Sequence, residues 1–240
     1  MSRVIFFILI YFMYLCLKAL QNYKISLRWQ NFRYFFVPLR TQNDNILIYM
    51  KVNIAIFASG GGTNAENIIR YFHDSELVYT ALVVSNKADA PVLEKAQRLG
   101  VKTQVVLKSQ LNDAAVMIPL LRQYAIDFIV LAGFLPLVPD FLVDAYPRRI
   151  INIHPSLLPK YGGKGMWGHH VHEAVKAAGE TETGMTVHWV TPVCDDGEII
   201  AQYRVALSPE DTADDIAAKE HVLEMEYFPK VIEQILKENF

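Results

Sequence analysis

Apolar and polar positions from residue 52 onward form short segments that alternate between two patterns. Strands are predicted at residues 52–58, 77–85, 102–107, 127–132 and 149–153, and the first of them has the apolar pattern of a buried strand. Helices between them are predicted by amphipathic stretches at residues 64–72, 91–99 and 114–124. Strands and helices that alternate in this way form βαβ units. We therefore expect an α/β fold with a mostly parallel, twisted sheet and helices on both faces.

The pattern changes after Gly184, where two longer strand-like runs follow each other without a helix between them. They cover residues 185–190 and 198–207, and the turn-prone segment 194–197 joins them. This arrangement predicts an antiparallel C-terminal extension of the sheet, followed by a helix at residues 211–237.

Two helix starts have recognisable signals. Thr63 or Asn64 is the expected N-cap of the first helix, because their side chains can accept a hydrogen bond from its first turn. Pro91 is expected in the first turn of the second helix, where its missing N–H costs nothing.

Residues 1–49 differ in composition from the rest of the chain. Their apolar run at residues 4–17 is shorter than the roughly 20 residues needed to span a bilayer. Three interpretations stay open: a membrane anchor, a targeting segment, or translated sequence upstream of the true start. We favour the third, because Met50 and Lys51 directly precede the first predicted strand. We therefore expect a hydrophobic, basic extension at 1–49 that is not part of the fold, and one domain at 50–240.

Charge and cysteine content narrow the classes of function. The whole chain is 52% hydrophobic and 20% charged, as is typical of a globular protein. Residues 51–240 carry 17 Lys and Arg against 24 Asp and Glu, and this excess of acid disfavours nucleic-acid binding. The two cysteines, Cys16 and Cys194, exclude a disulfide framework and suit a reducing compartment.

Three consecutive glycines follow the first predicted strand and open the first predicted helix. Gly60, Gly61 and Gly62 let backbone N–H groups approach an anion closely, and the helix N-terminus adds partial positive charge, which indicates a phosphate site. Residues 59–64 match neither the dinucleotide nor the triphosphate fingerprint. A flexible turn without a ligand is an equal alternative.

Asn152 and His154 lie at the end of the strand predicted at residues 149–153. Because side chains alternate along a strand, both point to the same side. A histidine transfers protons near neutral pH, and an amide beside it can donate a hydrogen bond to a developing oxyanion. The alternative is a core histidine beside a turn-forming asparagine. The carboxyl end of a parallel strand, where ligands gather, favours the functional interpretation.

Asp195 lies in the connection between the last two predicted strands. An acid there can orient a histidine, raise its pKa and relay protons. From local sequence alone, Asp195, Asp196 and Gly197 are more typical of a plain turn.

A group of histidines precedes the antiparallel region. His169, His170 and His172 with Glu173 suggest metal ligands, but no second set with suitable spacing accompanies them. We therefore expect no metal and interpret this segment as a loop that enters a helix.

Six segments within residues 52–236 carry a resemblance to a known family. They read IAIFASGGGTN, VVSNKADAPVLEKA, DFIVLAGFLPLVP, IINIHPSLLPKYGG, GMTVHWVTPVCDDGEIIAQ and EYFPKVI. Together they resemble the phosphoribosylglycinamide formyltransferases, the folate-dependent glycinamide ribonucleotide transformylase family. Methionyl-tRNA formyltransferase and formyltetrahydrofolate hydrolase share the NIHPSLLP element in part, whereas the glycine-rich turn and the PKY continuation favour the glycinamide ribonucleotide family.

The resemblance implies a Rossmann-like fold and a role for each matching residue. Asn152 would hold the formyl oxygen and the oxyanion of a tetrahedral intermediate, His154 would be the charged or proton-transferring partner, and Asp195 would pair with it and shuttle protons. The ribonucleotide would be bound by Gly61, Gly62, Thr63, Asn64 and Glu224. Folate would contact Leu131, Gly133, Phe134, Leu135, Val138, Val190 and Cys194. Lys108 is our candidate for a second cation at the phosphate.

The implied activity is transfer of the formyl group of 10-formyltetrahydrofolate, as co-substrate, to the amine of glycinamide ribonucleotide in de novo purine biosynthesis. The amine would attack directly, without a covalent enzyme intermediate. We expect no metal, nucleic-acid or membrane partner, and a cytoplasmic monomer or homodimer. Two alternatives remain: a formyltetrahydrofolate hydrolase, and a membrane-tethered, non-catalytic folate- or nucleotide-binding module.

Overall fold

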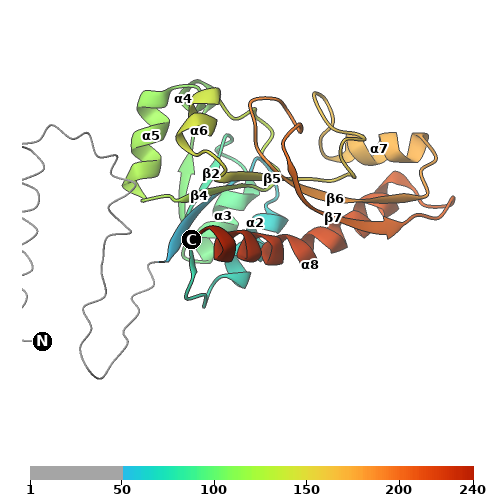
Figure 1. Ribbon diagram of the computed structural model, residues 1–240, viewed down its shortest axis with the longest axis horizontal. Coiled ribbons are helices and arrows are strands. Elements are labelled where there is room, and N and C mark those ends of the chain that lie inside the picture. Colours follow the sequence, from blue (N-terminus) through green and yellow to red (C-terminus); the bar gives the residue numbers. More distant parts are fainter. Residues whose placement is uncertain (1–50) are drawn as a thin grey trace, which may run out of the picture. The chain divides into compact units, whose positions relative to one another are not determined.

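A seven-stranded sheet organises the computed structural model, which describes residues 51–240 (Figure 1). Its strand order is β3-β2-β1-β4-β5-β6-β7. The parallel strands are β1 (Val52–Phe57), β2 (Val78–Ser85), β3 (Lys102–Val105), β4 (Phe128–Leu131) and β5 (Ile150–His154). The antiparallel strands are β6 (Glu182–Trp189) and β7 (Ile199–Ala206). The predicted α/β fold and its antiparallel extension are confirmed. The interpretations of residues 1–49 lie outside the described residues.

Helices cover both faces of this sheet (Figure 1). One face packs against α2 (Thr63–Tyr71), α3 (Pro91–Arg98) and α8 (Ala213–Asn239). The other packs against α4 (Lys108–Leu111), α5 (Ala114–Gln123) and α6 (Asp140–Ala145). The remaining helix, α7 (His169–Ala177), packs on α8 through a small apolar cluster.

Strand β1 supplies side chains to both of these cores. Ile54 and Ile56 belong to the core under α2, α3 and α8, whereas Ala55 and Phe57 belong to the core under α5 and α6. All four side chains are completely buried. Burial on both faces explains why residues 52–58 read as a continuous apolar run instead of an alternating one.

The start of α2 differs from its prediction. Its N-cap is Gly62, with φ 71°, and no side chain caps the helix, so the expectation of Thr63 or Asn64 was wrong. A Cβ atom built on Gly62 would lie 2.3 Å from Cγ2 of Val92, which leaves room for glycine alone. The prediction that Pro91 begins α3 is confirmed.

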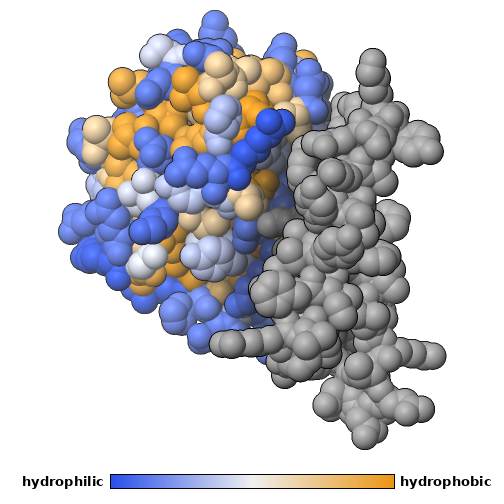
Figure 2. Space-filling view, turned by 90° about the vertical axis from the view of Figure 1, so that its left-hand side faces the viewer, coloured by the Kyte–Doolittle hydropathy of each residue, from blue (hydrophilic) through white to orange (hydrophobic). Residues whose placement is uncertain are grey.

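The last residue of the chain packs near the start of β4. Near the C-terminus, the ring of Phe240 contacts that of Phe128, the first residue of β4, with centroids 6.4 Å apart. Figure 2 shows one face of the molecule, on which apolar and hydrophilic residues are interspersed. Within residues 51–240, no helix combines the length and apolar character needed to cross a membrane.

Candidate active site

The carboxyl ends of β1, β4 and β5 open onto a cavity of about 1020 Å³. A smaller cavity of about 80 Å³ adjoins it, and both are lined by Asn152 and Asp195. The larger one contains the glycine-rich turn and part of α8, and most residues that line the smaller one are of apolar type. The predicted residues in the larger cavity are Gly61, Gly62, Thr63, Asn64, Gly133, Phe134, Leu135, Asn152, His154, Cys194, Asp195 and Glu224. The smaller cavity adds Leu131, Val138 and Val190. The structure thus brings these predicted residues together at two adjoining cavities, and Lys108 is not among them.

Ser59 fixes the glycine-rich turn to the loop that follows β4. Its backbone N–H donates to the carbonyl of Gly133 (3.0 Å), and its hydroxyl accepts from the N–H of Leu135 (2.9 Å). The same hydroxyl donates to Oδ1 of Asn86 (2.6 Å). These bonds hold the turn in place while Gly60 and Gly61 face open space on their Cβ side.

A lysine lines the large cavity at a position that the sequence did not single out. Lys87 follows β2 and is among the residues of the cavity wall. Lys108, our earlier candidate, begins α4 and is absent from that wall. Lys87 could have been found from its position after a parallel strand. Strand β2 is the neighbour of β1, and their carboxyl ends share one edge of the sheet.

Asn152 is oriented by a histidine that the sequence interpretation missed. The antiparallel register of β5 and β6 places His188 directly opposite Asn152. Nδ1 of His188 lies 2.9 Å from the carbonyl oxygen of Trp189, which can only accept, so Nδ1 carries the hydrogen. Nε2 of His188 therefore accepts from the Asn152 amide nitrogen at 3.1 Å. One amide hydrogen of Asn152 is used in this way, and the other is free for a ligand. In the sequence, the one feature that could have indicated a role for His188 is its position as a polar residue within a mostly apolar strand.

His154 lies between a backbone carbonyl and a carboxylate. Its Nε2 donates to the carbonyl oxygen of Tyr161 (2.7 Å), and its Nδ1 faces Oδ2 of Asp195 at 3.5 Å. Burial of the ring lowers the pKa of His154, and the nearby Asp195 carboxylate opposes this effect. The arrangement gives Nδ1 a site for a proton beside a fixed negative charge.

Asp195 is held by groups from three segments. Its backbone adopts φ 54°, and its Oδ2 accepts from the N–H of Gly163 at 2.9 Å. Burial raises the pKa of its carboxyl, but the neighbouring rings of His188 and His154 and the Gly163 N–H outweigh burial and lower that pKa to about 2. Asp195 is therefore ionised at neutral pH. Burial, together with this charge, raises the pKa of the Cys194 thiol to about 11.

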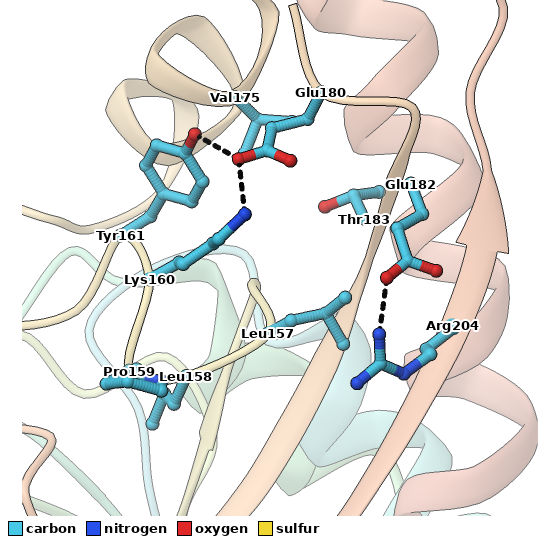
Figure 3. A pocket seen from close by; sticks show the side chains of 10 residues that line it. All are labelled: Leu157, Leu158, Pro159, Lys160, Tyr161, Val175, Glu180, Glu182, Thr183 and Arg204. Carbon is cyan, nitrogen blue, oxygen red and sulfur yellow. Dashed lines mark hydrogen bonds and ion pairs between the residues drawn. The ribbon is translucent and has the colours of Figure 1, made fainter. Parts of the chain in front are cut away.

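The carbonyl that accepts from His154 belongs to Tyr161, whose side chain is part of a polar cluster (Figure 3). The Tyr161 hydroxyl and the Lys160 ammonium group both donate to Oε1 of Glu180, each at 2.8 Å. These residues line a separate cavity of about 290 Å³, into which the hydroxyl of Thr183 also points (Figure 3). Since Tyr161 adopts φ 56°, its main chain depends on such side-chain anchors to stay in place.

The histidine group at residues 169–172 forms the first turn of α7. His169 and His170 are exposed and lie within 3.7 Å and 3.4 Å of Glu173 carboxylate oxygens, whereas His172 is buried. Among residues 51–240, no group of three or more His, Cys, Asp or Glu side chains has a metal-binding arrangement.

Residues 52–232 match the formyl transferase family along most of the described chain. The chain belongs to this family. Phosphoribosylglycinamide formyltransferase of Bacillus subtilis is 38% identical to this formyl transferase over 187 residues, which are 76% of this chain and 93% of the bacterial protein. The chloroplastic phosphoribosylglycinamide formyltransferase of Arabidopsis thaliana is 37% identical over 194 residues, 77% of this chain and 66% of the plant protein. This formyl transferase thus spans about two thirds of its plant relative's length.

A solved structure agrees with the fold of this formyl transferase. Phosphoribosylglycinamide formyltransferase from Anaplasma phagocytophilum superimposes with a TM-score of 0.72 at 34% sequence identity. The match covers 79% of this chain and 89% of that chain.

Proposed function

We propose that this chain transfers the formyl group of 10-formyltetrahydrofolate to the amine of glycinamide ribonucleotide, a step of de novo purine biosynthesis. The observation that carries the proposal is the meeting of two cavities at Asn152 and Asp195. One offers a helix N-terminus to a phosphate, and the other offers an apolar wall to a pterin ring. The names of the relatives support the same activity.

In the proposed reaction, the substrate amine attacks the formyl carbon and converts its carbonyl oxygen into an oxyanion. The free amide hydrogen of Asn152 would donate to that oxyanion. The attacking nitrogen loses a proton to the pair formed by His154 and Asp195, and N10 of the folate takes up a proton as it leaves. The bond from the amine to the formyl carbon forms, and the bond from that carbon to N10 breaks. No covalent bond to the protein is needed.

The proposed substrate contacts follow the two cavities. Backbone N–H groups of Gly61, Gly62, Thr63 and Asn64, with the Lys87 ammonium group, would bind the phosphate of the ribonucleotide. Glu224 would bind another part of the same substrate. Leu131, Gly133, Phe134, Leu135, Val138, Val190 and Cys194 would contact the folate.

A formyl-transfer assay on the purified protein tests this function. We expect formylated product to accumulate only when both substrates are present, and little formate to be released without the amine. Formate release that does not depend on the amine would instead identify a formyltetrahydrofolate hydrolase. Binding of both ligands without turnover would identify a non-catalytic binding module.

We extend the proposal to a cytoplasmic location and a monomer or homodimer. Its support is the content of two cysteines, which suits a reducing compartment. Fractionation of cells and light scattering of the purified protein test the two parts separately.

A further inference from the structure

Buried polar atoms without a partner gather at one corner of the large cavity. Five such side-chain atoms occur within residues 51–240, and three of them are Oδ1 of Asn64, Nδ1 of His172 and Oε1 of Glu220. These three residues come from α2, α7 and α8, and all line the same cavity. Because buried polar groups usually have partners, their concentration here indicates a polar network that serves the site.

Glu224 is the centre of this network. Its Oε2 accepts from the Asn64 amide nitrogen at 2.8 Å and from Nδ1 of His221 at 3.2 Å. The Glu224 side chain is 12% exposed and lines the cavity. Two donors from different helices thus fix one oxygen of a carboxylate that a ligand can reach.

Glu220 precedes Glu224 by one helical turn and supports it from the buried side. Glu220 is 2% exposed, and because residues four apart on a helix lie on the same face, its carboxyl group lies beside that of Glu224. Two carboxyl groups in such contact cannot both be ionised, so they share a proton. Among residues 51–240 no cation is paired with Glu220, and its Oε1 has no partner, so the neutral form belongs to this residue.

We propose that Glu220 is a positioning residue, which donates its proton to Glu224 and so aims that carboxylate at a hydroxyl-bearing sugar of the substrate. A carboxylate accepts hydrogen bonds, and the ribose of a ribonucleotide supplies hydroxyl donors. This inference rests on the function proposed above. The groups that face the pair are Asn64 from α2, His172 from α7, and His221 from α8 itself.

Two variants of the full chain separate positioning from mere packing. Glu220→Leu removes the donor, and we expect glycinamide ribonucleotide to bind about tenfold more weakly, because Glu224 loses a hydrogen bond to a charged group. Glu220→Gln keeps an N–H donor and should restore most of that affinity. Calorimetric titration with the ribonucleotide alone measures both, and the KM for the folate should stay within about twofold of wild type, because folate is bound elsewhere in the site.

The pH dependence of ribonucleotide affinity is a second measurement, and a purely structural role of Glu220 would not change it. Burial and the neighbouring Glu224 raise the pKa of Glu220 well above its usual range. The neutral donor is therefore present below the raised pKa and is lost as the pH rises through it. Wild-type affinity for the ribonucleotide should fall at alkaline pH more than that of Glu220→Gln. His221 is present in both proteins, and Glu220 is the only titratable group that differs between them.

The control is Glu226→Ala, an exposed carboxylate on the same helix that pairs with Lys230. It should bind the ribonucleotide like the wild type. The inference is overturned if Glu220→Leu binds like the wild type, or if Glu220→Gln binds as weakly as Glu220→Leu. If Glu220→Leu does not fold, the pH comparison of Glu220→Gln with the wild type decides alone. Failure of the wild type to bind glycinamide ribonucleotide would instead reject the proposed function.

Discussion

The proton affinity of His154 is set by two opposing influences. Burial disfavours a charged ring, whereas the Asp195 carboxylate, 3.5 Å from Nδ1, favours it. Since Nε2 is committed to the carbonyl of Tyr161, a proton that enters or leaves the ring does so at Nδ1, beside Asp195. The two side chains therefore act as one proton-transfer unit.

Removal of either member of this unit should affect turnover more than binding. We expect His154→Ala and Asp195→Asn each to lower kcat at least about 10²-fold, the scale of a lost proton-transfer or charge-stabilising group. Steady-state kinetics give the effect, and circular dichroism checks that the fold is kept. Turnover close to wild type in both variants would reject the assignment.

His188 should influence catalysis through the two site residues that it approaches, Asn152 and Asp195. In His188→Leu the amide of Asn152 loses the acceptor that fixes its orientation. We expect kcat to fall up to about tenfold, as for loss of one orienting hydrogen bond, with smaller changes in both KM values. His73→Leu, an exposed histidine after α2, is the matched control and should not change kcat. Equal kinetics in both variants would contradict this role.

Site residues could be predicted from sequence where a clear strand or helix pattern surrounded them. Asn152 and His154 end a predicted strand at the carboxyl edge of a parallel sheet, so their proximity to a cavity could be inferred from sequence. His188 and Glu220 could not be found in this way. Their importance comes from the antiparallel register of β6 and from packing between helices, which arise only in the tertiary structure.

Helices α2 and α3 pack closely against each other at Gly62, the N-cap of α2. The cap of α2 has positive φ, and Val92 of α3 occupies the space that a side chain would need. Sequence patterns located both helices but placed the N-cap of α2 on Thr63 or Asn64. Capping rules consider only the residues at the helix start, whereas here the contact with Val92 of α3 requires glycine at the N-cap. The short helices α4 and α6 were not predicted, since so few residues show no clear periodicity.

Gly62→Ala should destabilise the fold at this junction. We expect a loss of about 1–3 kcal/mol in the free energy of unfolding, from backbone strain and overpacking against Val92. A second substitution, Val92→Ala, should recover part of the loss by relieving the contact. Urea denaturation measures each effect. Gly60→Ala, where a Cβ meets nothing within 4 Å, is the control and should be milder.

The whole molecule shows how far sequence alone can specify an α/β architecture. The order of strands and helices could be inferred because β1, β2, β4 and β5 are buried on both faces and are mostly apolar in sequence. The partition of β1 between two cores, and the meeting of two cavities at Asn152, depend on sheet order, which local patterns do not encode.

We propose that residues 50–240 act as one formyltransferase domain and that residues 1–49 are dispensable. A chain that begins at Met50 should keep the kcat and the solubility of the chain that begins at Met1. Parallel purification and assay of the two proteins test this. Loss of activity or solubility in the shorter protein would assign a function to the first 49 residues.

The hydrogen bond between Asn64 and Glu224 joins residues 160 positions apart. During synthesis on a ribosome, the turn that contains Asn64 emerges long before the helix that contains Glu224. The site proposed for the ribonucleotide is therefore completed among the last events of translation. A nascent chain stalled before α8 would carry Asn152 and His154 but would leave the apolar residues beneath that helix uncovered, and transiently exposed apolar surface of this kind makes an incomplete chain prone to aggregation.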